Sequence, residues 1–340
     1  MKLLKLYADE QRKYGSYGTD SPLMKEIRKR YDCDEIVLSA DCSEEEKAEI
    51  IRKYDVLLTM WASPHVPNEL ADNPGKLRYI CNITGEISRW IDREIVESPH
   101  ITITNWGDAP AFGIAEGAMT LLLAVIKNIP YYVHAAGEGK VEKEIVVSGT
   151  QGSLYKKRIG IYGLGAIGSK FAQFLRPFEP VMYGFDPFVK AIPEGVAMVD
   201  SLEELFDKVQ ILVIHAGLTD QTRGSVTKEL LARLPDGGIV INTARGQIID
   251  YDALKAELMS GRLRAGLDVV TEHNLPDQDD PIRSLENVIF TAHRIGSGAW
   301  GISPEELDIP ATYCLENLER YRKGESLKYV MTPARYLLST

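Results

Sequence analysis

The sequence predicts a two-domain α/β protein in which both domains are built on parallel sheets. The chain has 340 residues, a length that favours two domains of about 150 residues or more each. Short apolar, β-branched runs alternate with amphipathic stretches along most of the chain, which is the pattern of βαβ units. One of these runs leads into a G-x-G-x-x-G motif and a helical stretch, the typical start of a dinucleotide-binding sheet.

Composition limits the kinds of partner that we expect. The chain carries 39 Lys and Arg against 49 Asp and Glu, a formal net charge of -10. No basic field attracts phosphate backbones or anionic membranes, so we expect no nucleic-acid and no membrane partner. The hydrophobic share of 44% and the charged share of 26% are those of a soluble globular protein. The first dozen residues lack the apolar core of a secretory signal, which favours a cytoplasmic location.

The cysteines are expected to be reduced thiols that pack in the core. None of the four belongs to a C-x-x-C pair, and no histidine stands at metal-ligand spacing from them. We therefore predict no metal site. The four are Cys33, Cys42, Cys81 and Cys314.

The first parallel sheet is predicted within residues 1–104. Its strands are the runs KLLKLYA, EIVLS, DVLLT, RYICN and ITIT. The clearest helix start is Ser43, which Glu46 follows at the spacing of a capping box.

A long apolar helix is predicted at residues 111–127, too short and too interrupted for a membrane span. It is either an ordinary core helix or a helix wedged between domains and against a second subunit. Residues 131–153 lose periodicity and read as an exposed loop. A second sheet of six strands follows, at 158–162, 181–185, 210–215, 238–242, 264–268 and 287–290. A last helical stretch at 304–323 would make the first domain discontinuous if it returned there.

The segment RIGIYGLGAIGSKFAQFL predicts a dinucleotide site. Gly163 permits the tight turn, Gly165 leaves room for a pyrophosphate to approach the backbone, and Gly168 allows close packing of helix and strand. The free N–H groups and the positive end of the helix face the anion. A glycine turn without a ligand is the alternative reading of the motif alone.

The strand VMYGF supports the dinucleotide site because it ends in Asp186, eighteen positions after Gly168. A carboxylate there accepts both hydroxyls of the adenosine ribose and repels a 2′-phosphate. The next three residues include no arginine to neutralise such a phosphate. The sequence therefore favours NAD over NADP.

Two side chains at the carboxyl ends of later strands predict acid chemistry beside the nicotinamide. Arg245, in INTARGQIID, can fork onto a small carboxylate, although an arginine there can also cap a helix or pair on the surface. His293, in VIFTAHRIGS, can exchange a proton near neutral pH, although a lone histidine is more often structural. Together with an NAD site they predict a 2-keto acid or 2-hydroxy acid substrate.

The chain resembles the NAD-dependent D-2-hydroxyacid dehydrogenase family over most of its length. The resemblance is carried by YGLGAIG with Asp186, HAGLTDQTRG at 215–224, INTARG, AGLDV and TAHRIGS, in the family's order and spacing. It implies a discontinuous flavodoxin-like substrate domain at residues 1–104 and 299–340 around an NAD-binding Rossmann domain at residues 105–298. It also implies a homodimer.

The resemblance implies roles for individual residues. Arg245 is similar to the substrate-binding and carbonyl-polarising arginine, His293 to the acid/base, and Asp268 to the residue that helps hold the nicotinamide end. The implied cofactor-binding set is Gly163, Gly165, Ala166, Ile167, Gly168, Asp186, Ala216, Thr222, Thr243, Ala244, Arg245, Asp268, His293 and Gly296. The implied substrate-binding set is Gly85, Glu86, Ile87, Arg245 and His293.

The sequence departs from the family at the carboxylate that hydrogen-bonds the catalytic histidine. The family places it five positions after the Asp of the LDV motif, and this position holds His273, with Glu272 one residue earlier. Either Glu272 fills the role after a one-residue shift, or His273 replaces it and weakens the acid by charge repulsion. We select Glu272 as the third catalytic residue; a surface glutamate without a catalytic part is the remaining alternative.

A second departure lies in the loop NITGEISRWID, which the family uses to receive the substrate carboxylate on backbone N–H groups. Gly85 matches, but Ile87 stands where a second glycine is common. Arg89, Trp61, Trp106 and Trp300 are candidates to shape a pocket, or they belong to the core.

We expect an NAD(H)-dependent oxidoreductase that transfers a hydride to or from C2 of a small 2-keto or D-2-hydroxy acid. The alternative is an NAD(H)-sensing binding protein of the same fold that has lost efficient catalysis. The displaced carboxylate motivates the alternative, and the intact Arg245 and His293 oppose it.

Overall fold

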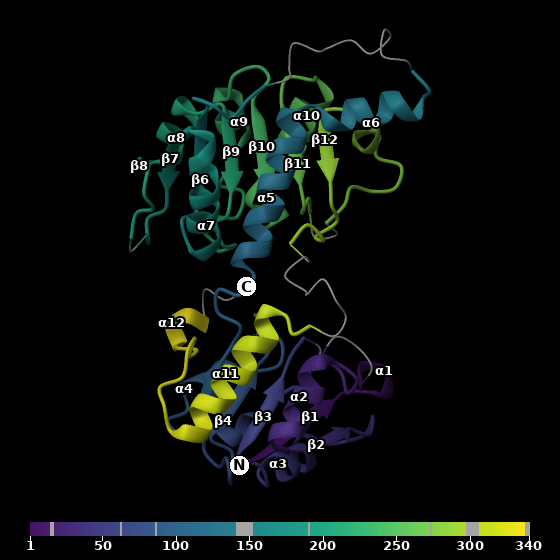
Figure 1. The fold of residues 1–340 in the computed structure, drawn as a ribbon, viewed down its shortest axis with the longest axis vertical. Coiled ribbons are helices and arrows are strands. Elements are labelled where there is room, and N and C mark those ends of the chain that lie inside the picture. The colour runs from purple at the N-terminus through teal and green to yellow at the C-terminus, as the bar shows by residue number, and fades with distance from the viewer. Residues whose placement is uncertain are drawn as a thin grey trace. The chain divides into compact units, whose positions relative to one another are not determined.

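The chain forms two compact units in the computed structural model (Figure 1). The structure describes residues 1–13, 17–61, 63–85, 87–140, 152–189, 191–271, 274–296 and 306–336. Unit 1 comprises Met1–Pro110 with Ala299–Thr340, and unit 2 comprises Ala111–Gly298. The first division falls at Pro110, a few residues after the expected boundary at 104.

Unit 1 is built on a five-stranded parallel sheet. Its strands pair in the order β2-β1-β3-β4-β5, which is the flavodoxin-like order. The flavodoxin-like prediction is therefore confirmed. The strands are β1 (Lys2–Tyr7), β2 (Asp32–Val37), β3 (Val56–Thr59), β4 (Tyr79–Asn82) and β5 (Thr102–Thr104).

Helices from both ends of the chain cover this sheet. The capping box predicted at Ser43 is present, with the Ser43 and Glu46 side chains each bonded to the other's backbone N–H. The last long helix begins after Asp308, whose carboxylate caps it, and packs on β4 and α2. Its return makes unit 1 discontinuous. The helices are α1 (Glu10–Lys13), α2 (Pro22–Arg30), α3 (Glu44–Ile51), α4 (Arg93–Glu97), α11 (Ile309–Lys323) and α12 (Pro333–Tyr336), with the 3-10 turn η1 (Asn68–Ala71).

Unit 2 is built on a seven-stranded parallel sheet in the order β12-β11-β10-β9-β6-β7-β8. The six predicted strands are present, but the expected number was one too low. The additional strand, β8, lies at the edge and has only three residues, too few to show a period. The strands are β6 (Arg158–Tyr162), β7 (Val181–Phe185), β8 (Val196–Met198), β9 (Ile211–Ile214), β10 (Ile239–Asn242), β11 (Arg264–Leu267) and β12 (Val288–Phe290).

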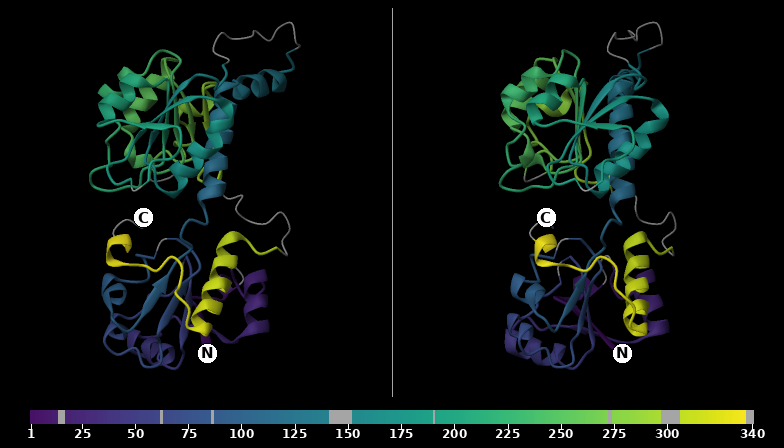
Figure 2. Two further views of the ribbon diagram at one scale, coloured as in Figure 1. Left: turned by 60° about the vertical axis from the view of Figure 1, so that its left-hand side comes forward. Right: turned by 90° about the vertical axis from the view of Figure 1, so that its left-hand side faces the viewer.

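Helices cover both faces of the unit 2 sheet (Figure 2). One hydrophobic core includes residues of α5 and α7, and a second includes residues of α8, α9 and α10. The helices are α5 (Ala111–Ile126), α6 (Ile129–Gly137), α7 (Ala166–Leu175), α8 (Leu202–Lys208), α9 (Lys228–Arg233) and α10 (Tyr251–Met259). Short 3-10 turns are η3 (Arg176–Phe178), η4 (Gly246–Ile248) and η5 (Pro281–Ser284).

Helix α5 has the place of a core helix within unit 2. It packs on β10, β11 and α7, and Gly266 admits it because a Cβ there would lie 2.9 Å from Leu121 Cβ. The expected loop at 131–153 is wrong in its first part, since α6 continues to Gly137 after a turn at Asn128. No single helix among the described residues has the length and apolar character of a membrane span. Only α5 and α6 taken together do so, and they are bent by 65°.

Candidate active site

The strands of the unit 2 sheet end in one row. Phe185, Tyr162, Ile214, Asn242, Leu267 and Phe290 are successive Cα partners across six parallel strands. The residues that follow them therefore begin their loops at the same edge of the sheet. These residues are Asp186, Gly163, His215, Thr243, Asp268 and Thr291. Open α/β sheets bind ligands at this edge, next to the strand where the order reverses, which here is β6.

The glycine turn after β6 fits a bound pyrophosphate. Gly163 has a φ of 92°, and a Cβ there would lie 2.4 Å from the Ala216 nitrogen. At Gly168 a Cβ would lie 2.0 Å from the Gly163 carbonyl oxygen. Apart from its chain neighbours, no described residue has an atom within 4 Å of a Cβ placed at Gly165, the exposed N-cap of α7. The turn is thus tight on the protein side and open on the other, where the first N–H groups of α7, from Ala166 and Ile167 on, lack helical partners.

Asp186 is fixed beside this turn. Its Oδ2 accepts a hydrogen bond from the Leu164 N–H, and its Oδ1 accepts one from the Phe188 N–H, both at 2.8 Å. Each carboxylate oxygen retains a lone pair for a ribose hydroxyl. The carboxylate is thereby held at the carboxyl end of β7, next to the glycine turn.

His215, which the sequence reasoning did not select, is the buried polar group of the neighbouring loop. The residue is half-buried, and its Nε2 atom is buried without a hydrogen-bond partner among the described residues. Burial lowers the pKa of His215 to about 3, so the ring is neutral. Its Nδ1 lies 3.5 Å from Thr243 Oγ1. An unpaired buried nitrogen at this edge fits a site that a polar ligand completes.

Two other predicted cofactor contacts lie in the same loop region. Ala216 directly follows His215 and approaches Gly163. The Thr222 hydroxyl donates to the Gly217 carbonyl at 2.7 Å, which closes the loop on itself.

The Arg245 loop is held by backbone packing. Asn242 Nδ2 donates to the Arg245 carbonyl, and Asn242 Oδ1 accepts from the Ala244 N–H, each at 3.0 Å. A Cβ on Gly246 would lie 2.1 Å from the Val270 carbonyl oxygen. Only glycine therefore allows the loop after β10 to lie against the loop after β11. In the sequence, the glycine directly after Arg245 is the signal for this contact between the two loops. The sequence analysis did not predict the contact.

The His293 loop is organised by one buried carboxylate. Asp268 is 3% exposed, and its Oδ1 accepts from the Thr291 hydroxyl at 2.6 Å, the Arg294 N–H at 2.9 Å and the Ile295 N–H at 3.1 Å. The Asp268 carbonyl accepts from the His293 N–H at 2.6 Å. His293 has a φ of 59°, an unusual value that these hydrogen bonds maintain.

Helix α5 packs directly against this loop. A Cβ on Gly117 would lie 2.8 Å from the Ile295 carbonyl oxygen, and a Cβ on Gly296 would lie 2.7 Å from Ile114 Cγ1. Gly296, a predicted cofactor contact, thus has a packing reason to be glycine.

The pKa of His293 is lowered from its usual value. Partial removal from water is the main cause that lowers the pKa of His293, and the positive charge of Arg245 is the second. The Asp268 carboxylate acts in the opposite direction. A guanidinium and an imidazole that sense each other's charge can bind a carboxylate and exchange a proton with the adjacent oxygen.

Four predicted residues lie outside the described part of the chain. They are the two relay candidates, Glu272 and His273, together with Glu86 and Trp300. The assignment of the relay carboxylate therefore stays a prediction. Among the described residues, no group of three or more His, Cys, Asp or Glu side chains has the arrangement of a metal site.

In unit 1, the loop after β4 is closed by an aromatic side chain. A Cβ on Gly85 would lie 2.2 Å from Trp106 Nε1. The Gly85 carbonyl accepts from Asn105 Nδ2 at 2.9 Å. Trp106 in turn meets Trp61 edge to face, with 5.1 Å between ring centroids. The Ile87 side chain is fully buried in the core, so only the backbone of this predicted substrate residue is left to face a ligand.

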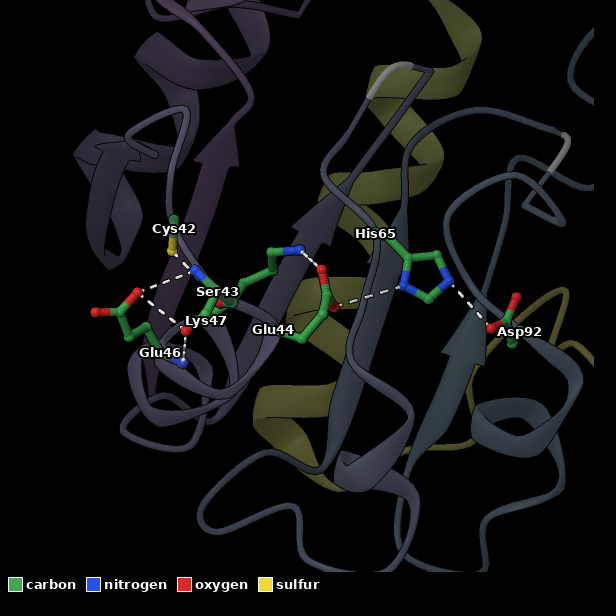
Figure 3. Close-up of polar contacts among 7 residues, drawn as sticks. All are labelled: Cys42, Ser43, Glu44, Glu46, Lys47, His65 and Asp92. Carbon is green, nitrogen blue, oxygen red and sulfur yellow. Dashed lines mark hydrogen bonds and ion pairs between the residues drawn. The ribbon is translucent and has the colours of Figure 1, made fainter.

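A histidine joins the neighbouring loops of unit 1 (Figure 3). His65 Nε2 lies 3.1 Å from Asp92 Oδ2, and His65 Nδ1 lies 3.7 Å from Glu44 Oε2. Glu44 also pairs with Lys47, and Asp92 accepts from Asn68. The contacts connect α3, the segment after β3 and the start of α4.

The strand order and the edge residues of unit 2 define a dinucleotide-binding α/β protein, and comparison with known proteins gives its family. The model of the D-isomer specific 2-hydroxyacid dehydrogenase family, NAD binding domain, matches residues 119–294. The chain belongs to the D-isomer specific 2-hydroxyacid dehydrogenase family. The predicted family and the predicted cofactor, NAD, are confirmed.

Relatives in this family act on different acids. The chain is 31% identical over 87% of its length to a D-3-phosphoglycerate dehydrogenase of Methanocaldococcus jannaschii, of which it covers 55%. It is 33% identical over 76% of its length to a hydroxypyruvate reductase of Thermotoga maritima, of which it covers 83%. The chain thus spans about half the length of the first relative and most of the second.

Solved structures agree with the fold. D-mandelate dehydrogenase of Rhodotorula graminis superposes with a TM-score of 0.77 at 21% identity, with 97% of each chain covered. An acyclic imino acid reductase in complex with NADPH and D-Arg gives a TM-score of 0.72 at 25% identity, with 96% of this chain and 99% of that chain covered.

Proposed function

We propose that the protein is an NAD(H)-dependent oxidoreductase that interconverts a small 2-keto acid and the corresponding D-2-hydroxy acid. The observation that carries the proposal is that Arg245 and His293 follow strands that end at the same edge as the glycine turn, where the charge of Arg245 lowers the pKa of His293. The names of the relatives above fit this reaction class. Nothing in the comparisons supports the alternative of a sensing protein.

The chain's own residues would bind the acid and move the proton. NAD(H), when bound, supplies or accepts the hydride at C2. Arg245 binds the substrate carboxylate and polarises the adjacent carbonyl. His293 donates a proton to the ketone oxygen during reduction and accepts it during oxidation. Asp268 keeps the His293 loop in place.

Asp186 supports a preference for NAD over NADP. Its two backbone hydrogen bonds hold the carboxylate where a 2′-phosphate would meet a negative charge. We expect NADH to bind at least tenfold more tightly than NADPH, as measured by fluorescence titration. Asp186→Ser should narrow that ratio, and equal binding of both cofactors to the original protein would contradict this preference.

The reaction is tested by mixing the purified protein with NADH and a panel of 2-keto acids that includes glyoxylate, hydroxypyruvate and pyruvate. Loss of absorbance with at least one acid is the expected result. Tight NADH binding without turnover on any acid would instead support the sensing alternative.

His293→Asn should lower the turnover rate at least 10²-fold, because a positioned general acid accelerates a reaction by about 10² to 10⁴-fold. NADH affinity should change little. Reduction needs the protonated imidazole, so its rate should fall as pH rises through the lowered pKa of His293. The oxidation rate should rise over the same interval. A reduction rate that increases with pH there would contradict the assignment.

We also propose a homodimer located in the cytoplasm, with no nucleic-acid or membrane partner. Ile129 and Val133 on α6 are 44% and 67% exposed, an apolar surface that a second copy would cover. The net charge of -10 disfavours nucleic acid. Light scattering should give a molar mass twice that of one chain. Val133→Asp should lower the measured mass toward that of one chain.

A further inference from the structure

Two of the four cysteines meet inside unit 1. Cys81 lies in β4 and Cys314 in α11, 233 positions apart in sequence, and their sulfur atoms are 3.5 Å apart. The two residues are 1% and 3% exposed. Both belong to the hydrophobic core between the sheet and α11. This pair is separate from the residues assigned above to the cofactor and the substrate.

A buried lysine accompanies the pair. Lys5 of β1 is fully buried, and its Nζ has no hydrogen-bond partner among the described residues. The Tyr7 ring centroid lies 5.8 Å from it. Lys5 and Cys81 lie in one row of the sheet, since each is a Cα partner of Leu58 in β3, and the charge of Lys5 favours the thiolate form of Cys81. Burial of an unpaired ammonium is costly, and a thiolate in this cluster would compensate the charge.

Cys81 is the member of the pair that ionises more readily. Its pKa is lowered, first by the hydrogen bond from the Cys314 thiol and also by the charge of Lys5. The Thr104 hydroxyl lies 4.0 Å from the same sulfur. Burial lowers the pKa of Lys5 to about 8, close to the range in which a thiol releases its proton. Lys5 can therefore hold the proton that Cys81 loses.

We propose that Cys81 and Cys314 are a redox-active pair, which hydrogen peroxide converts to a disulfide between β4 and α11 with Lys5 as the charge partner of the Cys81 thiolate. The alternative is a packing contact between two inert thiols. A disulfide needs a sulfur separation of about 2 Å, so the approach from 3.5 Å is short.

The chemistry balances in two steps. The Cys81 thiolate attacks one oxygen of hydrogen peroxide, an S–O bond forms as the O–O bond breaks, and the leaving hydroxide takes the proton from Lys5 and becomes water. The Cys314 sulfur then attacks the sulfenic sulfur of Cys81. An S–S bond forms, the S–O bond breaks, and the leaving hydroxide takes the Cys314 proton. Two thiols are oxidised, and one peroxide is reduced to two waters.

The product is identified on the full chain by mass spectrometry. The protein is treated with hydrogen peroxide, remaining thiols are blocked with N-ethylmaleimide in denaturant, and a non-reducing digest is analysed. We expect a Cys81–Cys314 cross-linked peptide that dithiothreitol removes, together with a higher melting temperature. Cys42→Ser, at a cysteine outside the pair, should leave the cross-link unchanged.

Two variants separate the steps. Cys314→Ser should leave a sulfenic acid on Cys81 that dimedone traps. Lys5→Met should slow cross-linking at least tenfold, with circular dichroism as the check that the variant is folded. If Lys5→Met does not fold, the dimedone experiment on Cys314→Ser still tests whether peroxide oxidises Cys81.

The proposal is overturned if peroxide leaves Cys81 and Cys314 fully reactive toward maleimide in denaturant while it oxidises Cys42. A cross-link that joins Cys33 instead would also overturn it. An unchanged rate in folded Lys5→Met would overturn the role of Lys5 as charge partner.

Discussion

The carboxyl edges of the two sheets are built from different kinds of contact. In unit 2, three glycines at the edge face backbone atoms: Gly163 faces the Ala216 nitrogen, Gly168 the Gly163 carbonyl and Gly246 the Val270 carbonyl. In unit 1, Gly85 faces the Trp106 side chain. Where a glycine meets another residue's backbone, only the glycine itself must be kept, because every residue has the same backbone atoms. Where a glycine meets a side chain, the contact changes whenever that side chain is replaced.

The family model that matches describes the NAD binding domain and covers residues 119–294, which lie in unit 2. A backbone-built edge keeps the same glycines whatever acid is bound. The unit 1 edge depends on the side chains of Trp106 and Trp61, so a substitution there can alter this edge without altering the NAD site. We therefore expect the choice of acid to follow from unit 1 residues.

The largest effect is expected where backbone meets backbone. Gly246→Ala brings a Cβ to 2.1 Å from the Val270 carbonyl oxygen, so the Arg245 loop must move. Unfolding free energy should fall by about 2 to 4 kcal/mol, and kcat/KM for 2-keto acid reduction should fall at least 100-fold. Gly137→Ala, at a glycine with open space around it, is the matched control and should change neither quantity.

Asp268→Asn should have the next largest effect, because three hydrogen bonds converge on one charged oxygen. We expect turnover to fall about 10- to 100-fold, in line with the loss of a buried charge-assisted network. Loss of the carboxylate charge should also lower the pKa of His293 further. The pH limit of the reduction should then move to lower pH. Asp236→Asn, an exposed position, serves as the control, and an unmoved pH profile would argue against the anchoring role.

Unit 1 should allow a rescue that unit 2 does not. Gly85→Ala alone should destabilise the protein by about 1 to 3 kcal/mol, because the new methyl group meets the Trp106 ring. Adding Trp106→Ala opens that space, so the double variant should recover part of the loss. The parallel double variant Gly246→Ala with Val270→Ala should recover nothing, since the Val270 carbonyl remains. Thermal melts of the four proteins test the comparison, and equal recovery in both units would contradict it.

The smallest effect is expected at His65. Its partners are partly exposed, and exposed ion pairs contribute about 0 to 1 kcal/mol. His65→Gln should therefore change stability and KM only slightly at neutral pH. The pKa of Asp92 is lowered by the Asn68 hydrogen bond and by His65, so this stabilisation is present above the usual carboxylate pKa and is lost as pH falls through the lowered value. Melts from pH 7 to pH 3 should show the wild-type advantage disappear at the acidic end.

Local patterns predicted the parts of the molecule that depend on neighbouring residues. Both sheets, the Ser43 capping box and the glycine turn were predicted because each is encoded within a few consecutive positions. Arg245 and His293 were selected because each lies in the loop that follows a strand. The structure places both loops at the same edge of the sheet, since the strands are parallel and end in one row.

Contacts between distant segments were not predictable in this way. The Cys81–Cys314 pair, the His65–Asp92 contact and the buried nitrogen of His215 each depend on the packing of elements far apart in sequence. Strand β8 was missed because three residues carry no period. Residues 131–137 of α6 were assigned to a loop because this short stretch shows no clear hydrophobic period.

The placement of α11 has a consequence for how the protein is made. All five strands of unit 1 are translated by Thr104, but α11, which packs on β4, begins at Ile309. A ribosome that adds about 5 to 20 residues per second needs roughly 10 to 40 seconds for the intervening chain. During that time the nascent sheet lacks the part of its cover that α11 supplies, so the surface of β4 and α2 on which α11 packs stays exposed until synthesis has passed Lys323.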